Sequence, residues 1–159
     1  MVEITEEKVN AIKALSHLAP FYDYLGMEVV DVRNCYAKLR IPWRKELLQV
    51  QGLIHGGVLA TLCDSAVGVA LLTSLDPEDI TVTIELNVNY LLPVRAGEIV
   101  AEGRILHRGR RTALGDVEVM NEGNIVCHSS ATYMIIKKED RASTEAAPTY
   151  KTKKYRCDF

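Results

Sequence analysis

The chain has 159 residues, enough for one domain with a buried core, and its 48% hydrophobic and 25% charged residues exclude a disordered or fibrous protein. Its net charge of −2 gives no overall bias toward nucleic acid or an anionic membrane surface, so neither is expected as a partner. The four cysteines show no CxxC or metal-type spacing, and the first 13 residues are too charged for a secretory signal. We therefore expect a cytoplasmic protein with reduced thiols and no metal.

The N-terminal residues predict two short helical pieces. Thr5 followed by two glutamates is typical of a helix start, because a hydroxyl caps free N–H groups and acids favour the positive first turn. Pro20 predicts the start of a second helical turn, and Gly26 predicts its end.

Two strands are expected next, over residues 27–32 and 36–41, with Asn34 in the turn between them. The stretch 49–75 is small or apolar on every face, which predicts a helix of about 20 residues, roughly 30 Å long, that is buried all round. It approaches the length of a membrane span, but its glycines and polar residues argue against one. Its charged residue, Asp64, is costly to bury, so this carboxylate is either neutralised by partners or faces a cavity.

Four further strands are expected, over residues 80–92, 97–106, 112–121 and 125–137. In the first of these strands, apolar and polar residues alternate, which predicts one apolar face. The residues of that face are Val82, Ile84, Leu86 and Val88. The last 21 residues are charged and have no sustained period, so we interpret them as a tail or as an arm onto a partner subunit.

A helix that is apolar on every face needs cover all round, and a curved antiparallel sheet of about six strands wrapped around it supplies that cover. We therefore predict an α+β domain over residues 27–138, between an N-terminal helical segment, 1–26, and a charged C-terminal tail, 139–159. Such a sheet has two exposed edges, and edge-to-edge pairing in a dimer is a common remedy.

Two motifs resemble those of the hot-dog-fold acyl-CoA thioesterases, and most of all the phenylacetic acid degradation type. The first is GLIHGG at 52–57 with Asp64 on the same helix, and the second is TIELNVNYLLP at 83–93. The basic turn RGRRT at 108–112 also matches. The resemblance covers residues 26–136, and it implies the hot-dog fold and hydrolysis of an acyl-CoA thioester to free acid and CoA.

The resemblance also implies roles for five residues. Asp64 takes the place of the catalytic carboxylate, as nucleophile or as general base on water, and Gly56 that of the glycine whose N–H polarises the thioester carbonyl. Gln49 stands where many members have Asn near the nucleophilic water. Thr83 matches a Ser or Thr that reaches the site from the neighbouring subunit, and His55 is the histidine of the motif, to which we assign no acid–base step. The implied CoA contacts are Gly57, Arg108, Arg110 and Arg111, and no cofactor is implied beyond the CoA of the substrate.

Helix geometry adds a constraint of its own. Gly56 and Asp64 lie eight residues apart, about 12 Å along one helix, so one chain cannot bring both to the same carbonyl. We therefore expect a site shared between subunits of a homodimer or homotetramer. Cys63 points about 100° away from Asp64 around the helix, which argues against a thiol nucleophile.

Alternatives remain open from the residues alone. Asp64 could cap or pair within an interface, and the arginine cluster is also typical of a solvated hairpin turn. One alternative function is a non-catalytic acyl-CoA binding hot-dog module, although no DNA-binding segment of a regulator is visible. Another is a hot-dog dehydratase or hydratase, which would use His55 together with a carboxylate. Aryl and medium-chain acyl groups are both compatible with the sequence.

Overall fold

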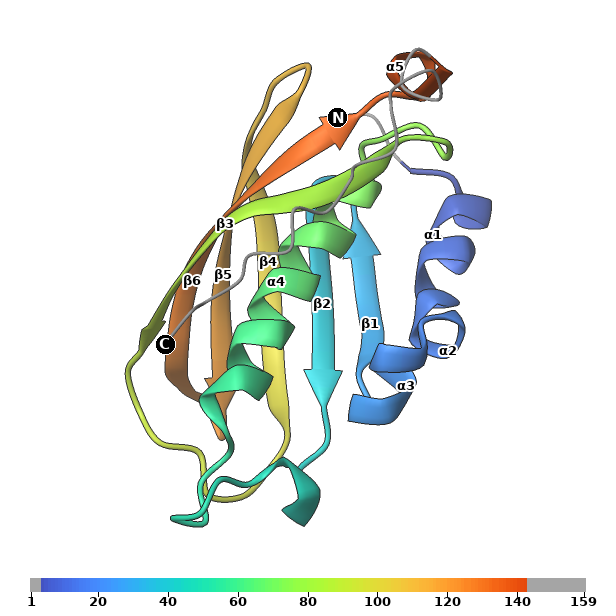
Figure 1. The fold of residues 1–159 in the computed structure, drawn as a ribbon. Helices are drawn as coiled ribbons and strands as arrows, with labels where there is room; N and C mark the ends of the chain where they lie inside the picture. The colour runs from blue at the N-terminus through green and yellow to red at the C-terminus, as the bar shows by residue number, and fades with distance from the viewer. Residues whose placement is uncertain (1–3, 143–159) are drawn as a thin grey trace, which may run out of the picture.

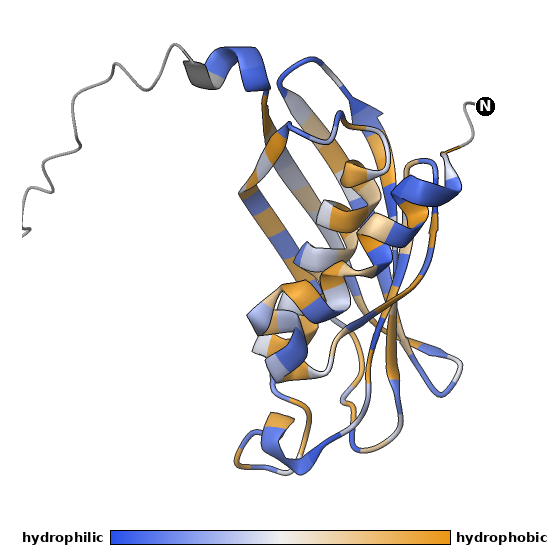
Figure 2. Cartoon of the chain, turned by 90° about the vertical axis from the view of Figure 1, so that its right-hand side faces the viewer, coloured by the Kyte–Doolittle hydropathy of each residue, from blue (hydrophilic) through white to orange (hydrophobic). Residues whose placement is uncertain are grey.

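The computed structural model describes residues 4–142, which form a curved six-stranded antiparallel sheet around one long helix (Figure 1). The strands are β1 (Glu28–Arg33), β2 (Tyr36–Ile41), β3 (Ile80–Tyr90), β4 (Ile99–Arg108), β5 (Thr112–Asn121) and β6 (Asn124–Ile136). Their order in the sheet is β1-β2-β4-β5-β6-β3, so β1 and β3 are the two edges. The predicted arrangement of about six strands wrapped around a central helix is confirmed. Hydrophobic and hydrophilic residues alternate along the strands, as Figure 2 shows.

The N-terminal helices flank the β1 edge of the sheet (Figure 1). They are α1 (Glu6–Lys13), α2 (Leu15–Leu18) and α3 (Pro20–Leu25). The predicted signals have their expected roles: the Thr5 hydroxyl accepts the Lys8 N–H at 3.3 Å, Pro20 begins α3, and Gly26 follows it at a left-handed φ of 65°. Helix α2 was not expected, since four residues leave no periodic signal.

The central helix is α4 (Gly56–Leu72), 17 residues that pack against the inner face of the sheet. It is shorter than the apolar stretch, because residues 49–55 form a loop that Leu48 and Ile54 close with a β-bridge. Glycines on the strands let α4 approach closely. A Cβ at Gly103 would lie 2.7 Å from the backbone of Ala66, and one at Gly115 would lie 2.5 Å from Val67.

Strand β3 departs from the predicted alternation. Its pairing with β6 shifts register between Thr83 and Glu85, so Ile84 forms a bulge. Val82 and Ile84 are therefore 51% and 54% exposed, and the prediction that they share one face with Leu86 and Val88 is wrong. The predicted apolar face turns inward only beyond the bulge, where Leu86 packs against the core. Before the bulge it is Thr83 that faces α4.

The two ends of the described chain add polar contacts. Lys137, just after β6, donates to the buried Asp79 just before β3 at 2.6 Å, which ties the edge strand β3 to the sheet. The short helix α5 (Lys138–Ala142) begins at the last residue of the predicted domain and continues into the predicted tail, and residues 143–159 lie outside the described residues. The boundaries of the three predicted segments stay a prediction. Among residues 4–142 no helix is both long and apolar enough to cross a membrane.

Candidate active site

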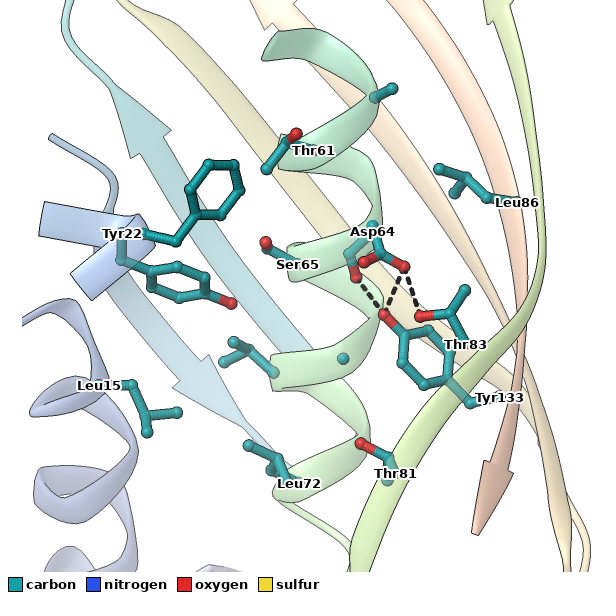
Figure 3. Close-up of a pocket in the computed structure, with 14 residues that line it drawn as sticks. Leu15, Tyr22, Thr61, Asp64, Ser65, Leu72, Thr81, Thr83, Leu86 and Tyr133 are labelled. Atoms are coloured by element: carbon teal, nitrogen blue, oxygen red, sulfur yellow. Dashed lines mark hydrogen bonds between the residues drawn. The ribbon is translucent and has the colours of Figure 1, made fainter. Parts of the chain in front are cut away.

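Asp64 is held by two hydroxyl groups from the sheet (Figure 3). Thr83 on β3 donates its hydroxyl to Oδ1 of Asp64 at 2.9 Å. The phenol of Tyr133 on β6 lies 2.7 Å from the same Oδ1 and 2.6 Å from the backbone carbonyl of Asp64. Both alternatives stated for this carboxylate therefore apply together: it has partners, and it lines a cavity.

Tyr133 was missed in the sequence, although it lies directly opposite Thr83 in the β3–β6 register. Burial, with the charge of Asp64 beside it, raises the pKa of Tyr133 well above its usual value, so the phenol keeps its proton and donates it. Gly68, one turn after Asp64, makes room for this hydroxyl, since a Cβ there would lie 3.1 Å from it. The alternating pattern of β6 places Tyr133 on its inner face, but no sequence signal pairs it with Asp64.

The two oxygens of the Asp64 carboxylate are not equivalent. Oδ1 accepts from both hydroxyls, whereas Oδ2 has no hydrogen-bond partner among residues 4–142. The cavity beside Asp64 has a volume of about 590 Å³ and lies between α2 and α3 on one side and β3 and β6 on the other. One carboxylate oxygen is therefore fixed, and the other is available to a bound molecule.

Within residues 4–142, the N-terminus of α4 keeps one backbone N–H group without an acceptor. His55 is the N-cap: its Nδ1 accepts the Gly57 N–H at 2.9 Å, which leaves the ring proton on Nε2 in the neutral form. The Gly56 N–H has no acceptor among the described residues. Tyr90 donates to the Gly56 carbonyl at 3.0 Å and packs against this glycine. Gly56, rather than Gly57, therefore presents an unused N–H at the positive end of the helix.

The structure does not bring all the predicted site residues together in one chain. Asp64 and Thr83 line the cavity, but Gln49, His55 and Gly56 do not. The Gln49 side chain accepts the Gln51 N–H at 2.8 Å, which holds it in its own turn. Gly56 lies eight positions, about 12 Å, before Asp64 on α4, as the spacing predicted.

The predicted CoA contacts are also divided between two ends of the molecule. Gly57 is at the start of α4, whereas the arginines 108, 110 and 111 are at the turn between β4 and β5, near the other end of α4 (Figure 1). Arg111 pairs with Asp140 of α5 at 3.6 Å.

The structure also places Thr83 and Cys63, for which specific expectations were drawn from the sequence. Thr83 bonds Asp64 of its own chain, because the Ile84 bulge turns it inward. That Thr83 reaches the site of Gly56 from a neighbouring subunit stays a prediction. Cys63 is fully buried and faces away from the cavity, with its sulfur 3.8 Å from that of Cys127. The Cys127 thiol and burial raise the pKa of Cys63, which argues against a thiolate nucleophile.

Comparison with known proteins identifies the protein family to which the chain belongs. Residues 51–128 match the family model of the thioesterase superfamily. The medium/long-chain acyl-CoA thioesterase YigI of Escherichia coli is 30% identical over 132 residues, with 73% of this chain and 85% of YigI covered. A mutant structure of the phenylacetic acid degradation protein PaaI from Thermus thermophilus is 31% identical, with a TM-score of 0.67, 72% of this chain and 97% of PaaI covered. Thioesterase HI1161 of Haemophilus influenzae, at 22% identity, shares the fold with a TM-score of 0.77 over 86% of this chain and 96% of its own.

The chain belongs to the thioesterase superfamily, the hot-dog-fold proteins that hydrolyse thioesters. The predicted family and fold are confirmed, and the protein is a thioester hydrolase.

Proposed function

We propose that the protein hydrolyses acyl-CoA thioesters to the free acid and CoA, at active sites shared between two subunits. The observation that carries the proposal is the Asp64 carboxylate beside a cavity, fixed through Oδ1 by Thr83 and Tyr133, with no hydrogen bond to Oδ2 from the residues that the structure describes. The E. coli relative YigI is named for acyl-CoA hydrolysis, which supports the same substrate class here.

The free oxygen of Asp64 is the one we expect to react. As a general base, Oδ2 takes a proton from water while the water oxygen bonds to the thioester carbonyl carbon. As a nucleophile, Oδ2 bonds to that carbon itself, and water then opens the resulting anhydride. In both routes the carbon–sulfur bond breaks, CoA leaves as the thiolate and is then protonated, and the N–H of Gly56 stabilises the oxyanion.

Because Gly56 and Asp64 of one chain are about 12 Å apart, the oxyanion donor must come from a partner chain. Strand β3 is 11 residues long, lies at a sheet edge and exposes Ile80, Val82 and Ile84. We propose that two chains pair antiparallel along this edge. In such a dimer the two α4 helices run antiparallel. Gly56, at the start of one α4, therefore lies at the same end of the dimer as the arginines of the partner's β4–β5 turn. A tetramer of two such dimers satisfies the same requirement.

The two alternative functions fit the site less well. A dehydratase or hydratase would need His55 as an acid–base partner of a carboxylate, but the Nδ1 of His55 already caps the Gly57 N–H. A non-catalytic binding module would have no need for a carboxylate oxygen that is fixed on one side and free on the other.

Thiol release from a panel of aryl- and alkyl-acyl-CoA thioesters tests the proposal. We expect wild-type protein to release CoA from at least one member with kcat/KM well above background. Binding of acyl-CoA without turnover of any member would support the non-catalytic alternative and contradict the proposed hydrolysis.

Tyr133→Phe is expected to lower kcat by roughly tenfold to a hundredfold with little change in KM. A hydrogen bond to a charged group is worth about 1.5–3 kcal/mol, and Tyr133 positions the carboxylate rather than the substrate. The measurement is kcat and KM with one acyl-CoA, together with Tm. The matched control is Tyr36→Phe, which removes a phenol hydroxyl from β2 and should leave both constants unchanged. An unchanged kcat for Tyr133→Phe would show that Thr83 alone positions Asp64.

A further inference from the structure

The cavity beside Asp64 is a groove that runs along one face of α4 (Figure 3). Its floor consists of two neighbouring rows of α4 residues, and within each row the residues are four positions apart and lie one above another on the helix. They are Ala60, Thr61, Asp64, Ser65, Gly68, Val69 and Leu72. The small residues Ser65 and Gly68 leave the groove open beside the carboxylate and beyond it.

The N-terminal helices form one wall of this groove. Leu15 of α2 and Tyr22 of α3 face α4 across the cavity, and Thr81 and Thr83 of β3 form the opposite wall (Figure 3). Hydroxyl groups gather near Asp64, where the phenol of Tyr22 interacts with Ser65. Burial raises the pKa of Tyr22, so this wall stays uncharged.

The groove is longer on one side of Asp64 than on the other. Leu72 lies eight positions from Asp64, about 12 Å along the helix, whereas Ala60 lies four positions, about 6 Å, in the opposite direction. At the far end Leu15, Leu72 and Thr81 face one another across the groove (Figure 3). An extended chain advances roughly 1.2 Å per bond, since three backbone bonds span about 3.5 Å. The longer arm therefore holds about ten carbons of a linear chain, well beyond the reach of a single aromatic ring.

We propose that the acyl tail lies on α4 between Asp64 and Leu72, beneath the N-terminal helices, and that Leu15 and Leu72 set the longest acyl chain accepted. The inference rests on the proposed acyl-CoA hydrolysis and names its substrate class: linear acyl groups of about ten carbons. The helical segment before the sheet is then part of the acyl-binding site rather than only a cover for the β1 edge.

Two variants shorten the groove from different elements: Leu72→Trp on α4 and Leu15→Phe on α2. We measure kcat/KM for straight-chain acyl-CoAs from butyryl to tetradecanoyl, and for phenylacetyl-CoA. In the wild type, kcat/KM should rise by up to fourfold per added methylene, as burial of a CH₂ predicts, until the groove is full near decanoyl. Either variant should lower kcat/KM for decanoyl-CoA at least tenfold and leave butyryl-CoA unchanged. If both variants keep the wild-type Tm and the wild-type chain-length profile, the proposal is overturned.

Leu18→Phe is the matched control, because it adds a ring to α2 at a position that is 71% exposed and outside the groove. Its chain-length profile should equal that of the wild type. Ala60→Leu narrows the opposite end of the groove, and a larger loss of decanoyl-CoA turnover there than in Leu72→Trp would mean that the tail runs the other way and would overturn the proposal. Calorimetry of decanoyl- and butyryl-CoA binding in an Asp64→Asn background separates the two proposals. Selective weakening of decanoyl-CoA by Leu72→Trp without any wild-type turnover would uphold the groove and refute the hydrolysis. Turnover with a preference for phenylacetyl-CoA that neither variant changes would uphold the hydrolysis and refute the groove.

Discussion

Replacing Asp64 with asparagine is expected to lower kcat/KM for a good acyl-CoA substrate by roughly 10²–10⁴-fold, the usual contribution of a positioned base. Asparagine keeps the size of the side chain, and its amide oxygen can still accept from Thr83 and Tyr133. The amide nitrogen then takes the place of Oδ2, where it can neither accept a proton from water nor attack a carbonyl carbon. Substrate affinity and Tm should change little, because the neutral side chain keeps its partners.

Asp79→Asn is the matched control for Asp64→Asn, since it alters a more deeply buried aspartate that has no part in the site. The Asp79 side chain is 3% exposed, and Lys137, its hydrogen-bond donor, holds its pKa below the usual value. Its contribution to stability is therefore fully present at neutral pH and is lost as pH falls through that lowered pKa. The control should lower Tm at pH 7 and retain kcat at 20 °C. Equal turnover by Asp64→Asn and wild type would remove Asp64 from the mechanism.

Local signals in the sequence predicted much of the fold. Thr5, Pro20 and Gly26 act on backbone groups within one turn of themselves, so their roles can be inferred without knowledge of the partner elements. The β3 bulge is different, because Ile84 is left unpaired where β3 pairs with β6, a strand some fifty residues further along the chain. A strict period of two was therefore the wrong expectation for the half of β3 that reaches the site.

The site residues likewise divide into those with a local sequence signal and those that only the folded sheet brings together. Asp64 and Gly56 were predicted from a motif on one helix, and helix geometry alone indicated that they serve different copies of the site. The contact of Tyr133 with Asp64 spans 69 positions, and only the folded sheet brings the two together. His55 and Gln49 were predicted as site residues, yet within one chain their side chains bond the local backbone, which a motif cannot distinguish from a role in catalysis.

Gly56→Pro is expected to lower kcat by roughly 10²–10³-fold, the usual effect of losing one oxyanion donor. Gly56 is the first residue of α4, where proline is well tolerated, and the preceding His55 already has φ −63° and ψ 134°, as a residue before proline prefers. The substitution thus removes the N–H and keeps the helix start. A new Cβ would lie 3.2 Å from the ring of Tyr90, so Gly56→Ala is the control: it adds the same carbon and keeps the donor. If both variants lose the same activity, crowding of Tyr90 and not the missing N–H is the cause.

Combining Gly56→Pro and Asp64→Asn in different chains then tests whether the site is shared. Each variant alone should be nearly inactive, because every site of its homodimer lacks one group. In a dimer of one Gly56→Pro chain and one Asp64→Asn chain, one site receives both defects and the other receives an intact Gly56 and an intact Asp64. Random pairing of equal amounts gives mixed dimers as half of the total, so co-expression should restore roughly a quarter of the wild-type activity. A site built within one chain cannot be restored in this way, and an inactive mixture that contains mixed dimers by mass spectrometry would refute the shared site.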